Sequence, residues 1–114
     1  MSKRGIKLYL EDIQDSIRKI EKYARGSSFD EFSRDEQLID AVVRNLSIIG
    51  EAVKNIPKEI KAKNPDMAWN EIKGMRNKVV HEYFGIDEEI LWKTVQDDLP
   101  IFKKQIAKLL KAIK

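Results

Sequence analysis

One short segment of the chain, residues 74–85, gathers an arginine, an amide, a tyrosine and the single histidine of the sequence. These side chains are Arg76, Asn77, His81 and Tyr83. Arginine offers a planar fork of donors to phosphate oxygens, and histidine exchanges protons near neutral pH. If the segment is helical, Asn77 and His81 lie about 40° apart around the axis, and Arg76 and Tyr83 about 20° apart. Two polar rows would then share one helix end, one able to meet a phosphate and the other to handle protons.

The same residues also suit structural roles. A lone histidine near the C-terminus of a helix interacts favourably with the helix dipole, and an arginine beside an asparagine is ordinary at a protein surface. Short motifs match by chance often enough that spacing alone favours this structural interpretation. Residue types and spacing therefore leave both roles open.

The elements that position the segment are predicted to be helices, because apolar residues recur every three or four positions and no useful strand-like alternation occurs. A first helix is predicted over about residues 4–25, closed by Gly26 in a left-handed conformation. Ser28 and Ser33 each stand three residues before a glutamate, which is the spacing of a capping box. A long helix with its apolar stripe over residues 39–56 is predicted to follow.

The second half of the chain carries the segment with the polar cluster. Within the long helix, Gly50 indicates the close approach of another helix, and Pro57 suits the first turn of a short helix that ends near residue 63. After a break at residues 64–66, Asp66 is predicted to cap a helix that ends near Tyr83. The last helical region is predicted to begin at Asp87, and Pro100 to bend or restart it near residues 97–99.

Short connections between such helices predict an all-α fold, an antiparallel up-down bundle of four to five helices. We expect residues 1–114 to form a single domain, since this length is usual for one hydrophobic core. The chain has no cysteine and one histidine, which excludes disulfides and a zinc site of the Cys/His type. Charges recur through the first twenty residues, so neither a signal peptide nor a membrane span is expected, and we predict a cytoplasmic protein. The net charge of +3 permits nucleic-acid binding without arguing for it.

The sequence resembles a known family at the polar cluster and on both sides of it. Arg76, four intervening residues, His81, one residue and Tyr83 reproduce the signature of the HepT-like toxins, a branch of the HEPN (higher eukaryote and prokaryote nucleotide-binding) superfamily. Residues 46–52 (LSIIGEA), 69–75 (WNEIKGM) and 83–87 (YFGID) are also similar to the family, as is Trp92, so the resemblance covers about residues 8–110.

This resemblance implies an HEPN-like bundle and a metal-independent endoribonuclease, the toxin of a type II or type VII toxin–antitoxin system, with no metal or cofactor. Arg76 and His81 would be the catalytic pair, and Asn77 would orient His81 or bind the phosphate. The residue chemistry agrees, since RNA cleavage without a metal needs a base for the 2′-hydroxyl, an acid for the leaving 5′-oxygen and a cation for the phosphorane. A homodimer with the motif at its two-fold axis supplies the second histidine that a single chain lacks.

The family also implies a partner, a minimal nucleotidyltransferase (MNT) antitoxin that transfers AMP to Tyr83 or neutralises the toxin by forming a complex with it. The added nucleotide would bring bulk and negative charge to the place where RNA phosphates bind. The alternative is a non-catalytic dimeric subunit that binds nucleotide or substrate for a nucleotidyltransferase, in which Arg76 and His81 only bind. We expect the dimer interface to run beside His81.

Other residues have weaker claims on function. Asn45 and Glu51 could line a cleft, although solvated helix positions are more common. Trp69 and Trp92 are more often anchors in a core or interface than platforms for base stacking. The lysines of the last helix usually only solvate a face, although they could steer RNA. They are Lys103, Lys104, Lys108, Lys111 and Lys114.

Overall fold

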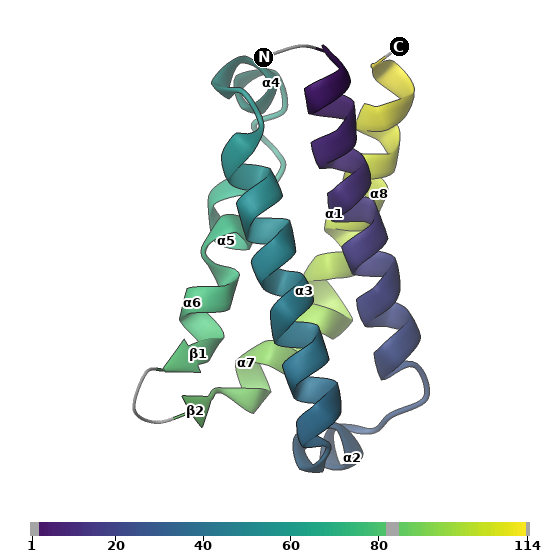
Figure 1. Ribbon diagram of the computed structural model, residues 1–114, viewed down its shortest axis with the longest axis vertical. Helices are drawn as coiled ribbons and strands as arrows, with labels where there is room; N and C mark the ends of the chain where they lie inside the picture. Colours follow the sequence, from purple (N-terminus) through teal and green to yellow (C-terminus); the bar gives the residue numbers. More distant parts are fainter. Residues whose placement is uncertain (1–2, 82–84, 114) are drawn as a thin grey trace.

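Two long antiparallel helices form the front of the molecule (Figure 1). The computed structural model describes residues 3–81 and 85–113. The long helices are α1 (Lys3–Ala24) and α3 (Glu36–Asn55), and the short α2 (Phe29–Arg34) lies in the connection between them. The later elements are α4 (Lys58–Lys63), α5 (Trp69–Lys73), α6 (Met75–Val79), β1 (Val80–His81), β2 (Gly85–Ile86), α7 (Glu88–Lys93), the π-helical turn η1 (Thr94–Asp98) and α8 (Leu99–Ala112).

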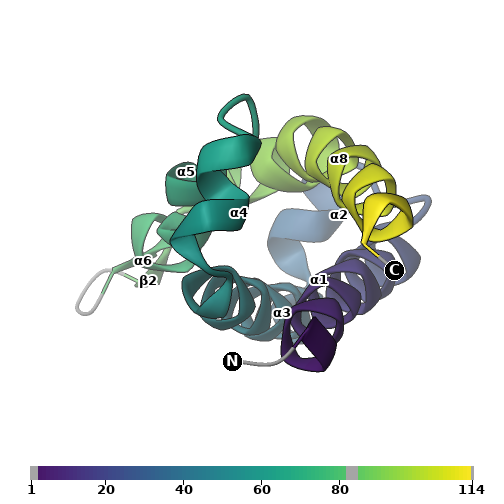
Figure 2. The same ribbon diagram turned by 90° about the horizontal axis from the view of Figure 1, so that it is seen from above.

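Seen along the bundle axis, α1 and α3 make one side, while α8 and the α4–α6 segment make the other (Figure 2). α8 packs on α1, and both α5 and α6 pack on α3. The chain therefore runs down α1, up α3, down through α5 and α6 and up through α7 and α8 (Figure 1). The predicted all-α, up-down bundle is confirmed.

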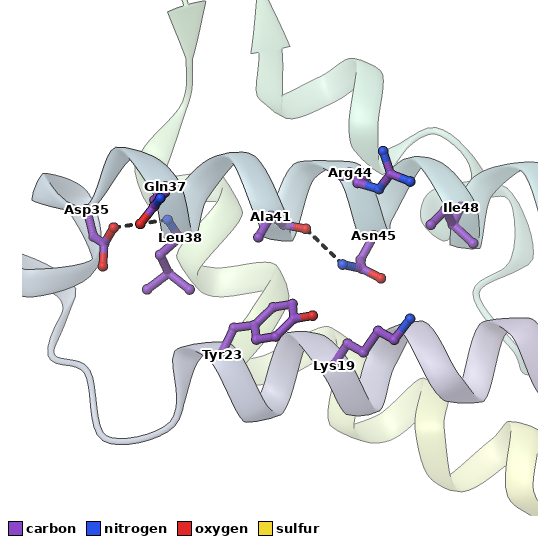
Figure 3. A pocket seen from close by; sticks show the side chains of 9 residues that line it. All are labelled: Lys19, Tyr23, Asp35, Gln37, Leu38, Ala41, Arg44, Asn45 and Ile48. Atoms are coloured by element: carbon purple, nitrogen blue, oxygen red, sulfur yellow. Dashed lines mark hydrogen bonds between the residues drawn. The ribbon is translucent and has the colours of Figure 1, made fainter.

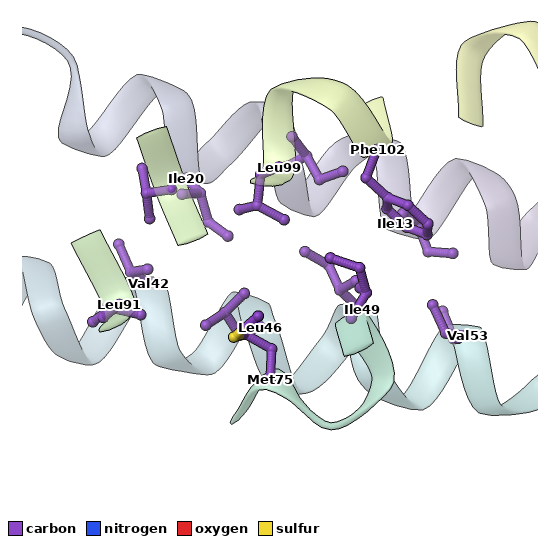
Figure 4. Close-up of a cluster of buried hydrophobic side chains, with 14 of the residues drawn as sticks. Ile13, Ile20, Val42, Leu46, Ile49, Val53, Met75, Leu91, Leu99 and Phe102 are labelled. Carbon is purple, nitrogen blue, oxygen red and sulfur yellow. The ribbon is translucent and has the colours of Figure 1, made fainter. Parts of the chain in front are cut away.

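The core lies where the apolar stripes of these helices meet (Figure 4). Every third or fourth residue of α1, α3 and α8 contributes a side chain with essentially no exposure, as the periodicity predicts. Burying one such Leu, Ile or Phe side chain is worth roughly 1.5–3 kcal/mol relative to leaving it exposed. Among these side chains are Ile13, Ile17, Ile20, Val42, Leu46, Ile49, Leu99, Phe102 and Ile106.

The ends of the first three helices follow local sequence signals, with one exception. Gly26 adopts φ 80° after α1, and Ser28 forms the expected capping box, in which its backbone N–H donates to Glu31 at 2.9 Å. Ser33, in contrast, does not cap the long helix. It lies inside α2, where its hydroxyl donates to a backbone carbonyl, and Asp35 caps α3 by accepting from the backbone N–H of Leu38 at 3.0 Å. Pro57 is the N-cap of α4, one residue before the helical turn that we predicted for it.

The structure contradicts the helix predicted from Asp66 to Tyr83. Met67 is buried, so the chain turns inward after Asp66, and α5 begins only at Trp69 with Ala68 as its N-cap. Gly74 then separates α5 from α6, which ends at Val79. The predicted angle between Asn77 and His81 around one helix axis is therefore wrong, because His81 lies on a strand.

Beyond α6 the chain forms a small hairpin instead of another helical turn. Val80 pairs with Ile86, and His81 with Gly85, in an antiparallel register. Two features explain the change: adjacent β-branched valines favour extended backbone, and Gly85 adopts φ 83°, which glycine tolerates best. The backbone N–H of Asp87 also donates to the carbonyl of Val79, at 2.6 Å.

The C-terminal region follows its prediction. Asp87 caps α7 by accepting from the backbone N–H of Ile90 at 3.1 Å. The π-helical turn η1 comes directly before α8, whose first turn contains Pro100. Proline cannot donate to the preceding turn, so the ordinary helical ladder is interrupted where the sequence predicts.

Candidate functional site

The candidate site lies in a groove where α3 passes close to α5 and α6. Gly50 makes this approach possible, because a Cβ built there would lie 3.0 Å from the backbone oxygen of Lys73. The predicted close approach at Gly50 is thus confirmed. The groove has a volume of about 420 Å³. It is lined by Ser47, Gly50, Glu51 and Lys54 from α3 and by Lys73, Gly74, Arg76 and Asn77 from α5, α6 and the residue between them.

Two of the predicted site residues share this groove. Arg76 and Asn77 are both exposed on the first turn of α6, and the guanidinium Nη1 of Arg76 donates to Oδ1 of Asn77 at 3.2 Å. Among residues 3–81 and 85–113, no carboxylate forms an ion pair with Arg76. Asn77 therefore orients the guanidinium while most of its donors stay free for an anion such as a phosphate.

The other two predicted residues follow α6 in the sequence. His81 ends β1, two residues after α6, so its backbone lies next to the helix that carries Arg76 and Asn77. Tyr83 lies outside the described residues. The structure thus brings Arg76 and Asn77 together and places the backbone of His81 close by in the chain, on a strand and not on the predicted helix.

The groove also holds charged residues that sequence reasoning did not single out. Lys54 and Lys73 line it with Arg76, and Glu51 is the one carboxylate among the lining residues that the structure describes. Glu51 is exposed and lines the groove, so its two sequence interpretations, cleft and solvated helix face, are both true of it. The signal for the lysines was present in their positions: Lys54 stands one helical turn after Gly50, and Lys73 directly precedes Gly74.

The two tryptophans are packing residues. Trp69 is buried, meets Phe102 edge to face with ring centres 5.6 Å apart, and donates through Nε1 to the backbone oxygen of Asn64 at 3.0 Å. Trp92 packs on Phe32 at 5.1 Å between ring centres. The core interpretation is therefore correct for Trp69, and Trp92 anchors α7 to α2.

Comparison with known proteins identifies the family. The sequence profile described as "Ribonuclease HepT-like" matches residues 13–109. The chain belongs to the HepT-like ribonuclease family. This confirms the family that the sequence resemblance predicted.

Relatives of this HepT-like chain match over almost their whole length. A protein named "Probable ribonuclease HepT" from Thermococcus cleftensis is 47% identical, over 96% of this chain and 99% of the relative. A candidate RNase from Caldanaerobacter subterraneus subsp. tengcongensis is 44% identical, over 90% of this chain and 91% of the relative. A candidate RNase from Methanocaldococcus jannaschii is 41% identical, over 99% of this chain and 93% of the relative. No solved structure matches the chain.

The lysines of the last helix do not line the groove of Arg76. On α8, Lys104, Lys108 and Lys111 are exposed, whereas Lys103 forms an ion pair with Glu21 at 2.7 Å. Across the described residues, no helix is both long and apolar enough to span a bilayer.

Proposed function

We propose that the protein is a metal-independent endoribonuclease. The observation that carries this proposal is the groove in which Arg76, oriented by Asn77, lies beside Lys54 and Lys73 in a member of a ribonuclease family. The relatives named above carry ribonuclease names, which supports the same activity here.

The proposed reaction uses proton transfer and charge stabilisation. The 2′-hydroxyl of the RNA attacks the adjacent phosphorus, a histidine takes its proton, and the bond to the 5′-oxygen of the next nucleotide breaks as that oxygen receives a proton. Arg76 binds the non-bridging oxygens and stabilises the charge that develops on the phosphorane. Asn77 holds the guanidinium in the orientation that this needs. The products are a 2′,3′-cyclic phosphate and a 5′-hydroxyl.

We further propose that the active unit is a homodimer. The chain has one histidine, and the reaction needs both a base and an acid. A two-fold axis beside β1 would present two copies of His81 and Arg76 to one phosphodiester. Each groove would then be open to RNA at a surface shared by two subunits.

In the cell we propose that this ribonuclease is a toxin of a type II or type VII toxin–antitoxin system. Its partner would be a minimal nucleotidyltransferase that transfers AMP from ATP to the hydroxyl of Tyr83, releasing pyrophosphate, or that blocks the site by forming a complex. AMP on Tyr83 would add a negative charge that competes with an RNA phosphate for Arg76.

The ribonuclease proposal is tested by incubating purified protein, free of any partner, with single-stranded RNA in EDTA. We expect cleavage that leaves 2′,3′-cyclic phosphate ends, and a loss of at least about 100-fold in rate for His81→Ala and Arg76→Ala. Lys22→Ala is the matched control, because it removes one exposed charge of α1 outside the groove. Binding of RNA or nucleotide without any cleavage would instead indicate the non-catalytic subunit.

The dimer and modification proposals have separate readouts. Light scattering should give twice the chain mass for the active species, and a monomer with full activity would contradict the composite site. After incubation with the nucleotidyltransferase and ATP, mass spectrometry should find AMP on Tyr83, and Tyr83→Phe should stay unmodified. Modification at another residue would refute the proposed role of Tyr83.

A further inference from the structure

A second groove, between α1 and α3, is larger than the one that holds Arg76. Its volume is about 490 Å³, which is within the range of small-molecule binding sites. Lys19 and Tyr23 line it from α1, and Arg44, Asn45 and Ile48 line it from α3 (Figure 3). It combines an aromatic ring, an amide, two cations and apolar side chains.

The aromatic and apolar groups of this groove are open to solvent. Tyr23 is 43% exposed and Ile48 is 37% exposed, whereas the stripes on the core sides of the same helices are buried. No aromatic ring of the described residues packs on Tyr23. No described aromatic ring therefore competes with a flat partner for the exposed part of this ring.

Asn45 supplies a fixed hydrogen-bond acceptor. Asn45 is only 5% exposed. Its Nδ2 donates to the backbone oxygen of Ala41 at 2.9 Å. Its Oδ1 points toward α1 (Figure 3) and has no protein partner among the described residues. Among the described residues, every fully buried polar side-chain atom has a hydrogen-bond partner. Because this oxygen has none, it is not fully buried and is accessible from the groove.

The cations lie on both walls. Arg44 is exposed and forms no ion pair with any described carboxylate. Lys19 lies 3.5 Å from Asp15 in a solvent-exposed ion pair that contributes little. The carboxylate of Asp35, also on this groove, is engaged in capping α3. The groove thus offers positive charge to an anion next to a flat ring.

We propose that the α1–α3 groove binds one nucleotide of single-stranded RNA. The base stacks on Tyr23 and its exocyclic amino group donates to Oδ1 of Asn45, while Lys19 and Arg44 hold the neighbouring phosphate. Single-stranded RNA is recognised in this way, by stacking on aromatic rings, hydrogen bonds to base edges and contacts to phosphates. Because adenine, cytosine and guanine each carry an exocyclic amino group and uracil does not, the groove favours these three bases over uracil.

The two grooves can serve one RNA strand. Arg44 lines the α1–α3 groove and Ser47 lines the groove of Arg76, and these residues stand one helical turn apart on α3. A strand that crosses α3 therefore passes both grooves, with its scissile phosphate at Arg76 and a nearby nucleotide at Tyr23. In this form the inference rests on the proposed ribonuclease function.

Binding is measured first, in a His81→Ala background that leaves the RNA intact. A fluorescein-labelled single-stranded 12-mer of adenosine is titrated and its anisotropy recorded. Tyr23→Ala is expected to weaken binding on the order of tenfold, and Tyr23→Phe to retain it, because stacking needs the ring and not the hydroxyl. Arg44→Ala should weaken binding and lower the slope of log affinity against log salt by about 0.7, the value for one lost phosphate contact on a single strand. Lys22→Ala is the matched charge control on α1.

Cleavage separates this inference from the proposed function. In the otherwise unchanged protein, Tyr23→Ala should cleave a dinucleoside monophosphate at the unchanged rate, because that substrate spans only the groove of Arg76. The same variant should show a raised KM for the 12-mer with kcat retained. Circular dichroism of Tyr23→Ala should match the unchanged protein, since the side chain is exposed.

Three outcomes would overturn the inference. Equal binding of the 12-mer by Tyr23→Ala, Arg44→Ala and the parent protein would show that the α1–α3 groove is not used, and the ribonuclease proposal would stand. A change in subunit number caused by Tyr23→Ala would show that the groove is an interface between copies of this chain. Equal affinity for adenosine and uridine 12-mers would remove the role of Asn45. If the unchanged protein cleaves neither substrate, the proposed function fails, whatever the binding results.

Discussion

Replacing Gly50 by alanine changes the point where the long helix α3 meets α5. The new Cβ would lie 3.0 Å from the carbonyl oxygen of Lys73. This oxygen belongs to the backbone, so it cannot rotate away, and α5 must move relative to α3. Crowding of this kind costs typically 1–3 kcal/mol. Alanine regains about 1 kcal/mol of helix propensity over glycine. The variant should therefore lose about 1 kcal/mol of unfolding free energy.

Gly74→Ala is the matched control, because the same atoms are added next to the same groove. Its Cβ would lie 3.5 Å from the nearest backbone oxygen, which is an ordinary contact, and its φ of −89° and ψ of −1° suit alanine. A compatible replacement of this kind stabilises by about 0.4–1 kcal/mol through the unfolded state. The two variants should thus differ in sign.

Urea denaturation followed by circular dichroism measures the unfolding free energy of both variants. In thermal unfolding, a change of about 1 kcal/mol corresponds to roughly 4 °C in Tm for a chain of this size. The shift of α5 also moves Lys73 and the helix that carries Arg76, so kcat/KM for RNA should fall in Gly50→Ala and stay near the original value in Gly74→Ala. A Gly50→Ala protein that is as stable as the original and cleaves RNA as fast would refute the close-approach argument.

Other predictions concern caps and packing. Asp35→Ala should destabilise the fold by about 1 kcal/mol in urea, because Asp35 caps α3, while Ser33→Ala should be nearly neutral. The hydrogen bond from the Ser28 backbone N–H holds the pKa of Glu31 below its ordinary value. The stabilisation by this carboxylate is therefore complete above the ordinary glutamate pKa and is lost as the pH falls through the lowered one, so the Tm difference between the unchanged protein and Glu31→Gln should be present at pH 7 and close in acid. Trp69→Phe should lose about 1 kcal/mol with its hydrogen bond, measured by thermal unfolding, and an unchanged Tm would contradict this contact.

Local sequence signals predicted most of the fold. The spacing of apolar residues gave α1, α3 and α8, since a helix presents every third or fourth residue to the same side. Gly26, Asp87 and Pro100 marked helix boundaries through their own backbone chemistry, which depends only on near neighbours. These features need no knowledge of distant residues.

The end of the helix that carries Arg76 was not predictable in the same way. The apolar spacing around Val79 and Val80 is compatible with a helix. The chain changes to a strand because Val80 pairs with Ile86, a residue beyond the expected end of that helix. Asp66 was predicted as a cap from its residue type, but the burial of Met67 moved the helix start to Trp69. At Trp69 a tertiary contact outweighed a local preference, whereas at Val80 the strand pairing and the adjacent valines outweighed the helical spacing.

The amino-acid sequence alone determined the long helices α1, α3 and α8, the family motif and the types of side chain available for chemistry, because each of these depends on composition and short-range spacing. Only the tertiary structure decided which residues surround Arg76. Glu51 and Lys54 lie more than twenty positions away in the chain, and they reach the same groove because α3 crosses α5 at Gly50. The tertiary structure also formed the groove between Tyr23 and Asn45. The surface left between two packed helices depends on how they cross and not on either helix by itself.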